Sequence, residues 1–365
     1  MLRLSPTMSL YLGRQFAIGF AIAIGVLSVL IFLVDLVELA RRAAGSDQAG
    51  FRVVLEMGIL HLPYLVQRIV PYAVLIGVML SLSRLTRKQE LVVMRGAGVS
   101  VWQFLAPAIG LALAMGMILV AVINPLASSM LSRYEQIDAK YIRQQAASLA
   151  VSTSGLWLRQ VEGEDEAVIH ALALSQPGLV LKGVTIFRYA GRDRFVERID
   201  ADSASLEQGE WQLRQALITS PDHPPERRAR HSFPTRLTIS QIQDSFASPE
   251  TLSFWELPNF IRLLDRAGFS SLKHRVHWLS ELVSPLLLCG MVLIAAGFSL
   301  RLTRRGGTGW LMSAGVAVGF SIYVFSDIVR ALGLSSNLPV LLAGWAPAVA
   351  SALFGLALLL YSAES

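Results

Sequence analysis

The chain has few charged residues and a single cysteine, and both shortages narrow its class. Only 16% of its 365 residues are charged, whereas 53% are hydrophobic, a balance too apolar for a soluble protein of this length. The lone Cys289 cannot form a disulfide within the chain, and its place in an uncharged run favours a role as a small packing residue. The composition therefore indicates an integral membrane protein.

Motifs for catalysis and nucleotide binding are missing from the sequence. A P-loop requires a lysine followed by serine or threonine, and no lysine of this chain meets that condition. Neither a His-Glu-x-x-His motif nor a nucleophile elbow is present. His274 and His277 lie one helical turn apart, but only Glu281 is near as a third ligand, which favours a structural role. We expect no enzyme activity, no cofactor and no metal, so energy for transport must come from another chain.

Six long uncharged runs predict six transmembrane helices, three before and three after a polar middle. A helix needs about 20 apolar residues to cross the hydrocarbon core. The second run is short, but only Arg68 separates it from the uncharged stretch Met57–Gln67. No small-residue cleavage pattern follows the first run, so we expect it to stay in the protein. The runs are Phe16–Val34, Ile69–Ser83, Gly96–Ser132, Leu282–Leu300, Gly306–Ser326 and Ala331–Ala363.

Basic residues are concentrated on one side of the predicted spans. Arg3 and Arg14 precede the first span, and the short loops after the second and fourth spans hold further clusters. By the positive-inside rule these segments lie in the cytoplasm, which places both termini there and the middle segment in the periplasm. Arg41, Arg42 and Arg52 in the opposite loop weaken the contrast without reversing it. The net charge of +6 is explained by these loops, and we expect no nucleic-acid partner.

The middle of the chain changes to a period of two, which predicts β-strands. The change covers Gly155 to about Asp244, with a hairpin turn at Glu207–Glu210. The predicted strands are Leu156–Leu158, Val168–Ala173, Val184–Tyr189, Arg198–Leu206 and Trp211–Ile218. Their spacing predicts an antiparallel sandwich or jelly roll.

The predicted organisation therefore has three regions. Residues 1–130 form a first membrane half, 131–250 an all-β periplasmic jelly-roll domain with a helical connector, and 251–365 a second membrane half. The third region begins with an amphipathic helix over Ser253–Gly268, which we expect at the membrane surface.

The stretch from Arg84 to Ser100 carries the most specific pattern. It predicts a short helix over about residues 84–98, with a basic start and a glycine stop at Gly96 and Gly98. Ser100 and Gln103 then predict a capping box at the start of the third span.

This short helix is expected to present one apolar face with one acid. Glu90, Val93, Met94 and Ala97 share that face at helical spacing. The face fits a groove on a soluble partner, where Glu90 would pair with a basic group. It fits the lipid headgroups equally well. The residues alone favour neither interpretation.

The run Glu90-Leu-Val-Val-Met-Arg-Gly-Ala-Gly resembles the coupling helix of the LptF/LptG family of lipopolysaccharide export permeases. Three other stretches agree, namely Val34-Asp-Leu-Val-Glu-Leu39, Ser253-Phe-Trp-Glu-Leu-Pro258 and Gly344-Trp-Ala-Pro347. The resemblance covers nearly the whole chain, and the first stretch and the coupling run favour the LptG branch over LptF. It implies a non-catalytic ABC-type permease of the bacterial inner membrane that passes lipopolysaccharide from the outer leaflet to a periplasmic bridge.

The resemblance also implies partners and contact residues. The partners are an LptF-type permease in a heterodimer, an LptB ATPase dimer on the cytoplasmic side, and LptC with the periplasmic bridge. The implied ATPase contacts are Arg87, Glu90, Leu91, Val93 and Met94. The implied lipopolysaccharide contacts are Arg41, Arg42, Ile31 and Asp35, where guanidinium groups suit phosphates. The implied lateral gate consists of Gly19, Ala23, Gly315, Val318 and Gly319.

Several of these assignments have alternatives. Arg41 and Arg42 also suit the anchoring of a helix end, and small residues four apart also suit packing within one subunit. Asp35 and Asp327 are expected to pair with other groups. For the whole chain the alternatives are the LptF branch, a mechanotransmitting permease that moves no lipid through its own lumen, and a membrane-anchored scaffold.

Overall fold

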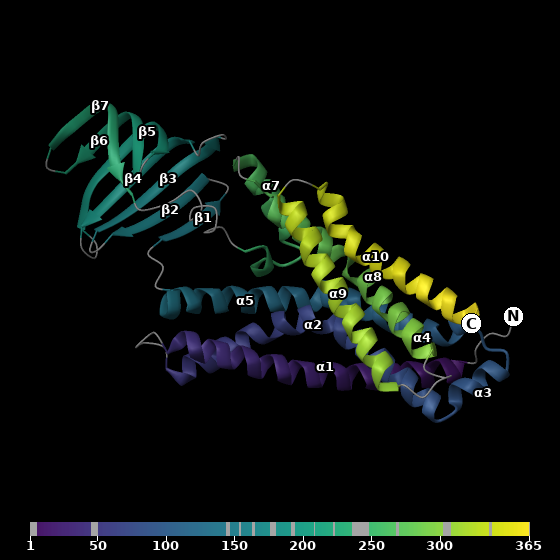
Figure 1. Cartoon of the computed structure of the whole chain (residues 1–365). Helices are drawn as coiled ribbons and strands as arrows, with labels where there is room; N and C mark the ends of the chain where they lie inside the picture. The colour runs from purple at the N-terminus through teal and green to yellow at the C-terminus, as the bar shows by residue number, and fades with distance from the viewer. Residues whose placement is uncertain are drawn as a thin grey trace. The chain divides into compact units, whose positions relative to one another are not determined.

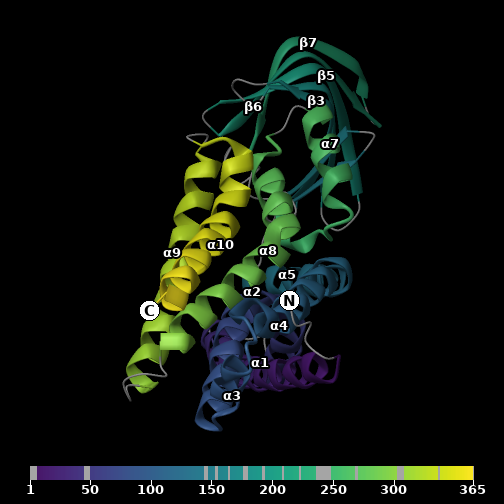
Figure 2. The same cartoon turned by 90° about the vertical axis from the view of Figure 1, so that its right-hand side faces the viewer.

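The structure is a computed structural model. It describes residues 6–44, 50–143, 147–152, 155–162, 165–175, 180–190, 194–207, 209–221, 223–235, 248–267, 270–301, 308–335 and 338–364. Contacts divide the chain into two units, Met1–Ile137 with Arg275–Ser365 and Asp138–His274. Figures 1 and 2 label the elements of both units.

Among the described residues, six helices are long and apolar enough to span a membrane, as the uncharged runs predict. The predicted class of six-span membrane protein is therefore confirmed. The span helices are α1 (Pro6–Ala43), α2 (Phe51–Arg87), α4 (Val101–Ile118) with its continuation, α8 (Leu272–Arg301), α9 (Thr308–Leu334) and α10 (Val340–Glu364). The short helix α3 (Glu90–Gly96) lies between α2 and α4.

The third span continues well beyond α4. It passes through a π-helical turn at Leu119–Ile123 into α5 (Asn124–Asp138) and a second π turn at Ala139–Arg143. The first π turn ends two residues before Pro125, which has no N–H to donate, and the helix continues through this position, which would otherwise break it.

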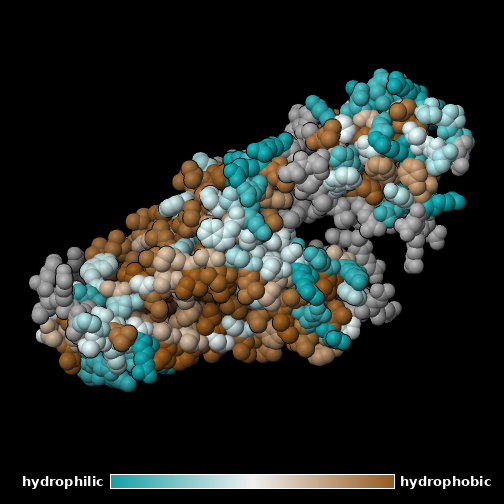
Figure 3. Space-filling model, turned by 180° about the vertical axis from the view of Figure 1, so that it is seen from behind, coloured by the Kyte–Doolittle hydropathy of each residue, from teal (hydrophilic) through white to brown (hydrophobic). Residues whose placement is uncertain are grey.

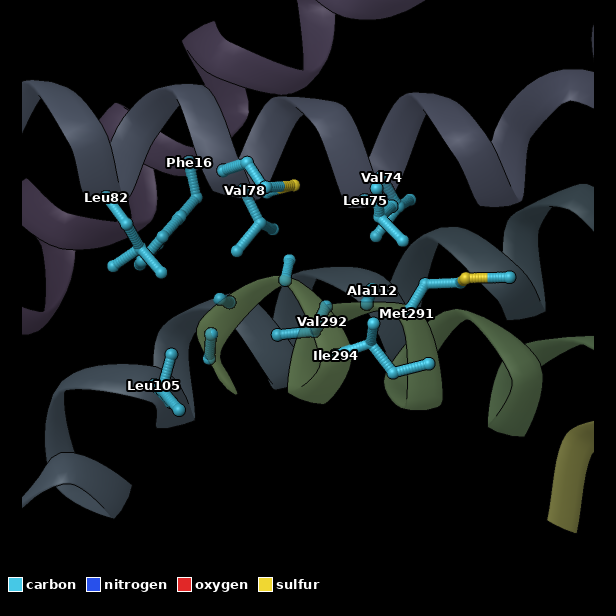
Figure 4. Close-up of a cluster of buried hydrophobic side chains, with 14 of the residues drawn as sticks. Phe16, Val74, Leu75, Val78, Leu82, Leu105, Ala112, Met291, Val292 and Ile294 are labelled. Atoms are coloured by element: carbon cyan, nitrogen blue, oxygen red, sulfur yellow. The ribbon is translucent and has the colours of Figure 1, made fainter. Parts of the chain in front are cut away.

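A buried apolar cluster, called the membrane core here, holds α1, α2, α4 and α8 together. Phe16 of α1, Leu82 of α2, Leu105 of α4 and Val292 of α8 are all buried in it (Figure 4). Around this core the outward surfaces of the long helices stay hydrophobic (Figure 3). Apolar residues on both the inner and outer sides of a helix are expected where lipid, and not water, surrounds the protein.

The described residues of the second unit form an antiparallel sheet in which each strand pairs with its neighbours in sequence. The predicted all-β insertion is confirmed, and the predicted hairpin turn lies between β5 and β6, where Gly209 has a φ of 84°. The strands are β1 (Ala147–Ser152), β2 (Gly155–Glu162), β3 (Asp165–Ser175), β4 (Val180–Ala190), β5 (Arg194–Glu207), β6 (Glu210–Ser220) and β7 (His223–Pro234).

The sheet curls around a second apolar cluster, called the sheet core here. It includes Ile169, Ile186 and Trp211 from three different strands. At one end the side chain of Gln160 in β2 reaches the chain just after β7, because Thr235 Oγ1 donates to Gln160 Oε1 over 2.7 Å. Both residues are buried, so this hydrogen bond satisfies polar groups that water cannot reach.

The helix α7 (Leu257–Ala267) packs its apolar face against the sheet. Leu264 is buried in the sheet core and Phe260 packs against it. The helix contacts β1 and β3 and belongs to the second unit (Figure 2). The assigned helix begins four residues later than the pattern predicts, although Ser253 and Glu256 form a capping box at the predicted start. The predicted end at Gly268 lies outside the described residues.

Candidate functional site

The short helix α3 is fixed at both ends by its own backbone and caps. It starts after Gln89, whose φ of 63° turns the chain out of α2. At its end, the N–H of Val99 donates to the Met94 carbonyl and that of Gly98 to the Arg95 carbonyl, which is a Schellman motif with Gly98 at a φ of 83°. The predicted glycine stop is therefore confirmed.

The predicted capping box at the start of α4 is confirmed as well. The Gln103 N–H donates to Ser100 Oγ, and the Ser100 N–H donates to Gln103 Oε1 over 3.0 Å. Because α3 ends at residue 96 and α4 begins at residue 101, the orientation of α3 is tied closely to the third span.

The buried and exposed sides of α3 differ from the single apolar face that the sequence pattern predicts. Leu91 and Met94 are only 1% and 7% exposed and belong to the membrane core. Val92 and Val93 are 47% and 69% exposed. Two residues of the implied contact set, Leu91 and Met94, therefore pack within the chain and anchor α3 to it. The exposed valines are the apolar residues left for a partner, with Arg87 exposed nearby in sequence.

Glu90 also has a partner within the chain. The hydroxyl of Tyr11, near the start of α1, donates to Glu90 Oε2 over 2.8 Å. The sequence pattern predicts that Glu90 pairs with a basic group on another protein. In the structure Glu90 instead links α3 to the first span. A charge-assisted bond of this length is among the stronger hydrogen bonds of proteins.

At the other end of α1, a basic cluster joins three helices. Arg41 donates to both carboxylate oxygens of Glu38, over 2.8 and 2.9 Å, and Arg42 lies 3.7 Å from the same carboxylate. Arg42 also donates to the hydroxyl of Tyr134 in α5 over 3.1 Å. Nearby in sequence, Arg133 of α5 lies 3.8 Å from Glu56 of α2. Two guanidinium groups therefore share one carboxylate, which leaves this group of three net positive.

Asp35 pairs with a histidine that the sequence pattern does not single out. His61 Nδ1 of α2 lies 3.0 Å from both carboxylate oxygens of Asp35. The His61 ring stacks on Tyr134 at 4.5 Å and on Tyr64 at 5.6 Å between ring centroids. The expectation that Asp35 pairs is confirmed, and Tyr134 links this pair to Arg42.

The position of this cluster along α1 follows from helix geometry. With a rise of about 1.5 Å per residue, Asp35 lies about 31 Å and Arg41 about 40 Å from Arg14. The hydrocarbon core is about 30 Å thick. If Arg14 stands at one membrane boundary, Asp35 stands at the opposite boundary and Arg41 beyond it, at the level of headgroups. Ile31, one turn before Asp35, is half-buried.

A second polar group links α2 and α9. Arg68 donates to the hydroxyls of Tyr64 and Tyr323 at 3.5 Å, and its guanidinium lies 5.8 Å from the Tyr64 ring centroid. Asp327 follows Tyr323 by one turn of the same helix, which places its carboxyl group on the same side of α9 as this polar group.

The small residues assigned to a gate pack within the chain. A Cβ on Gly19 would lie 2.5 Å from the carbonyl oxygen of Gly77 in α2, and Ala23 is buried. In α9, a Cβ on Gly315 would lie 2.6 Å from the Met79 side chain of α2.

The other two gate residues lie on the same side of α9. A Cβ on Gly319 would lie 3.3 Å from Leu75, and Val318 packs against the membrane core. The small residues therefore permit close approach to α2 of the same chain. The exposed faces of α1 and α9 carry larger residues instead, such as Val29 and Phe320.

Sequence reasoning missed His61, Tyr134 and Tyr11. His61 carried a signal, because it is the polar residue of a stretch otherwise suited to lipid. Tyr11 and Tyr134 carried none, since tyrosine is common near membrane boundaries. Among the described residues no group of three or more His, Cys, Asp or Glu is placed to hold a metal ion.

The comparisons with known proteins all indicate the same family. A family model for the lipopolysaccharide export system permease LptF/LptG matches residues 10–361. The LptG permease protein of Escherichia coli K12 is 24% identical over 311 residues, which cover 83% of this chain and 84% of that protein. The LptG permease protein of Haemophilus influenzae is 21% identical over 351 residues, which cover 94% and 95% of the two chains.

Proposed function

This chain belongs to the lipopolysaccharide export system permease LptF/LptG family, and from that membership we propose that it is the LptG-type subunit of an ATP-driven exporter. As a family member it is a multi-pass permease of the inner membrane and not itself catalytic. In the proposal it takes lipopolysaccharide from the outer leaflet and passes it to a periplasmic bridge. The proposed partners are an LptF-type permease, an LptB ATPase dimer and LptC.

The observation that carries the proposal is the division of α3 into an anchored face and an exposed face. Leu91 and Met94 fix the helix to the membrane core, while Val92 and Val93 project from it. A short helix that only lay on headgroups would not need rigid attachment at both ends. The exposed valines and the basic residues beside them suit a groove of an ATPase subunit on the cytoplasmic side.

Movement of α3 has two routes into the spans. The first is the packing of Leu91 and Met94 among side chains of α1, α2 and α4 in the membrane core. The second is the Tyr11–Glu90 hydrogen bond, which links α3 to α1. Tyr11 and Arg41 lie on the same helix, about 45 Å apart at 1.5 Å per residue. A displacement of α3 is therefore transmitted to the helix that carries the basic cluster.

The basic cluster supplies the proposed contact for the phosphates of the lipid. Arg41 and Arg42 both approach Glu38, so an incoming phosphate competes with that carboxylate for the two guanidinium groups. Guanidinium forks pair with carboxylate and phosphate alike, but a phosphate carries up to about two negative charges against the one of a carboxylate, which favours the phosphate in that exchange. Asp35 holds His61 and Tyr134 in place beside it, and Tyr134 orients Arg42.

For the gate we propose the exposed sides of α1 and α9 in place of the small residues. Gly19, Ala23, Gly315 and Gly319 bring α1 and α9 against α2, and this leaves the opposite sides of both helices open. Those sides carry large apolar residues, which suit acyl chains or the facing helices of an LptF-type partner. Val318 lies at the border between the two sides.

The assignment to the LptG branch is supported by the names of the relatives. Both relatives described above are called LptG, and each match extends over more than four fifths of both chains. The orientation with cytoplasmic termini is supported by the arginines at the start of α1 and around α3.

Reconstitution with the ATPase and the second permease tests the proposal. We expect Val93→Ala to reduce lipid-dependent ATP hydrolysis while leaving thermal stability unchanged, because Val93 is exposed. The matched variant Leu91→Ala should instead lower stability, since truncating a buried leucine to alanine costs roughly 2–5 kcal/mol. If Val93→Ala leaves the coupled activity intact, α3 is not the docking element.

A further inference from the structure

The sheet of the second unit carries a transverse crease on the face opposite the sheet core. One residue in each of the strands β3 to β6 is left out of the regular strand pairing. These residues are Leu172, Gly183, Asp202 and Gln215. Gly183 and Gln215 have φ values of 60° and 54°. A glutamine rarely adopts this left-handed conformation, and such positions gather where the backbone is shaped for binding.

The crease holds a polar cavity of about 530 Å³, a size typical of small-molecule sites. Thr185, Asp200, Asp202, Gln215 and Arg227 all line it. Thr185 Oγ1 donates to Asp200 Oδ1 over 2.9 Å, so this carboxylate has a defined position. Carboxylate, amide and hydroxyl groups together can accept from and donate to the hydroxyls of a sugar.

A row of basic residues runs beside the crease. The strand register pairs Lys182 with Ser203, Ser203 with Arg214, and Arg214 with Arg230, across β4 to β7. The residues next to this row, such as Leu181 and Leu213, are buried in the sheet core, so the row points to the opposite face. At about 4.8 Å between strands, the row is about 14 Å long.

This basic row is unfavourable for the sheet by itself. Arg214 and Arg230 stand directly opposite each other, and like charges in that arrangement destabilise a strand pair. Lys182, Arg214 and Arg230 are all exposed, and within the described residues none of the three forms an ion pair. Nearby arginines behave differently, since Arg188, Arg198 and Arg228 each pair with an acid.

We propose that the crease and the basic row together bind the phosphorylated saccharide of the exported lipopolysaccharide. The polar cavity takes sugar hydroxyls, and the row neutralises phosphate. This inference rests on the proposed function, because it takes the substrate from it. A protein surface fits less well, since the centre of a protein interface is usually apolar and poor in charge, whereas this cavity is concave and polar.

The test uses the full exporter complex in nanodiscs and a deacylated, phosphorylated core oligosaccharide as the probe. We expect Arg214→Gln with Arg230→Gln to weaken binding of the probe by about tenfold or more, as loss of charge-assisted hydrogen bonds predicts. The matched control is Arg194→Gln with Arg266→Gln, which removes two exposed charges of the same unit away from the crease. The control should bind the probe like the wild type.

Three further measurements distinguish recognition of a phosphorylated sugar from plain anion binding and from misfolding of the variant. A dephosphorylated probe should bind wild type and the double variant equally weakly, and inorganic phosphate alone should not compete at matched phosphate concentration. The double variant should be at least as stable to heat as wild type, because it removes a like-charge contact. A loss of binding through misfolding would lower the stability instead.

Equal probe binding by wild type and the crease variant would overturn the inference. So would loss of LptC from the complex with unchanged probe binding, because the row would then be a protein contact. Export of lipid by the wild-type complex tests the proposed function separately. If that export fails, the proposed function fails with it. If the wild-type complex exports lipid but the crease variant binds the probe like the wild type, only this site is rejected.

Discussion

Substituting Gly19 by alanine should destabilise the chain, whereas the same change six residues later should not. A Cβ at residue 19 would lie 2.0 Å from Ser81 Oγ and 2.5 Å from the Gly77 carbonyl oxygen. Ser81 can turn away only by giving up its hydrogen bonds to the Gln15 and Gly77 carbonyls, of 3.0 and 2.8 Å. The Gly77 carbonyl belongs to the backbone of α2 and cannot move without the helix.

The magnitude follows from these contacts. Overpacking a close interface costs roughly 1–3 kcal/mol, and losing a hydrogen bond adds roughly 0.5–1.5 kcal/mol. Alanine returns at most about 1 kcal/mol through its better helix propensity. We therefore expect Gly19→Ala to lower the free energy of unfolding by about 1–3 kcal/mol. Gly25→Ala, where the added Cβ meets nothing within 4 Å, should be neutral or slightly stabilising.

Thermal unfolding of both variants in detergent, first alone and then with the partner permease, measures this difference. If Gly19 formed a seam between subunits, Gly19→Ala would be as stable as wild type alone and would weaken only the assembled complex. That result would refute the assignment of Gly19 to packing between α1 and α2. A loss of stability confined to Gly25→Ala in the complex would instead place the open side of α1 at the partner interface.

Three further outcomes are expected. Tyr11→Phe removes the hydrogen bond to Glu90 and should lower lipid-dependent ATP hydrolysis several-fold, of the order that one charge-assisted hydrogen bond allows, without releasing the ATPase in pull-down experiments. Asp35→Asn and His61→Ala should be non-additive in stability, since the two residues are in contact, and a double-mutant cycle measures the coupling. In the sheet, burial and then Arg228 lower the pKa of His231 below its ordinary 6.5. The folded unit therefore binds fewer protons than the unfolded chain, and its stability should fall as pH falls below 6.5. His231→Gln should flatten this dependence in thermal unfolding from about pH 7.5 to about pH 5.

The membrane spans could be read from the sequence because lipid imposes a simple rule. Every span needs about 20 apolar residues, so uncharged runs indicate helices directly. The third span extends beyond its uncharged run, which ends at Ser132, because charged residues outside the hydrocarbon core do not end a helix. The strands β2 to β6 could be read because alternation follows burial on one face.

The sequence pattern did not predict the two end strands, β1 and β7, and for β7 the reason is physical. In β7 every described side chain except Phe233 and His231 is exposed, so no alternation of polar and apolar residues exists to be read. Two prolines near its start also argued against a strand. At the edge of the described sheet a strand needs only one pairing partner, and proline is tolerated there.

The faces of α3 show a different limit. The run Leu-Val-Val-Met contains apolar residues at four consecutive positions, so helical period alone cannot say which side is buried. Tertiary packing decides it, because Leu91 and Met94 are longer than valine and reach the membrane core. Likewise the contacts of Glu90 and Asp35 join residues 79 and 26 positions apart, and one sequence holds no record of such pairs.

Site-specific photocrosslinking of lipopolysaccharide in the assembled complex tests the central claim most directly. A probe at Arg41, in the last turn of α1, should form a lipid adduct that diminishes when ATP is hydrolysed. The same probe at Val93 should form an adduct with the ATPase and none with lipid. Absence of any lipid adduct at Arg41, in a complex that still crosslinks at Val93, would contradict the account and favour a permease that transmits force without carrying lipid.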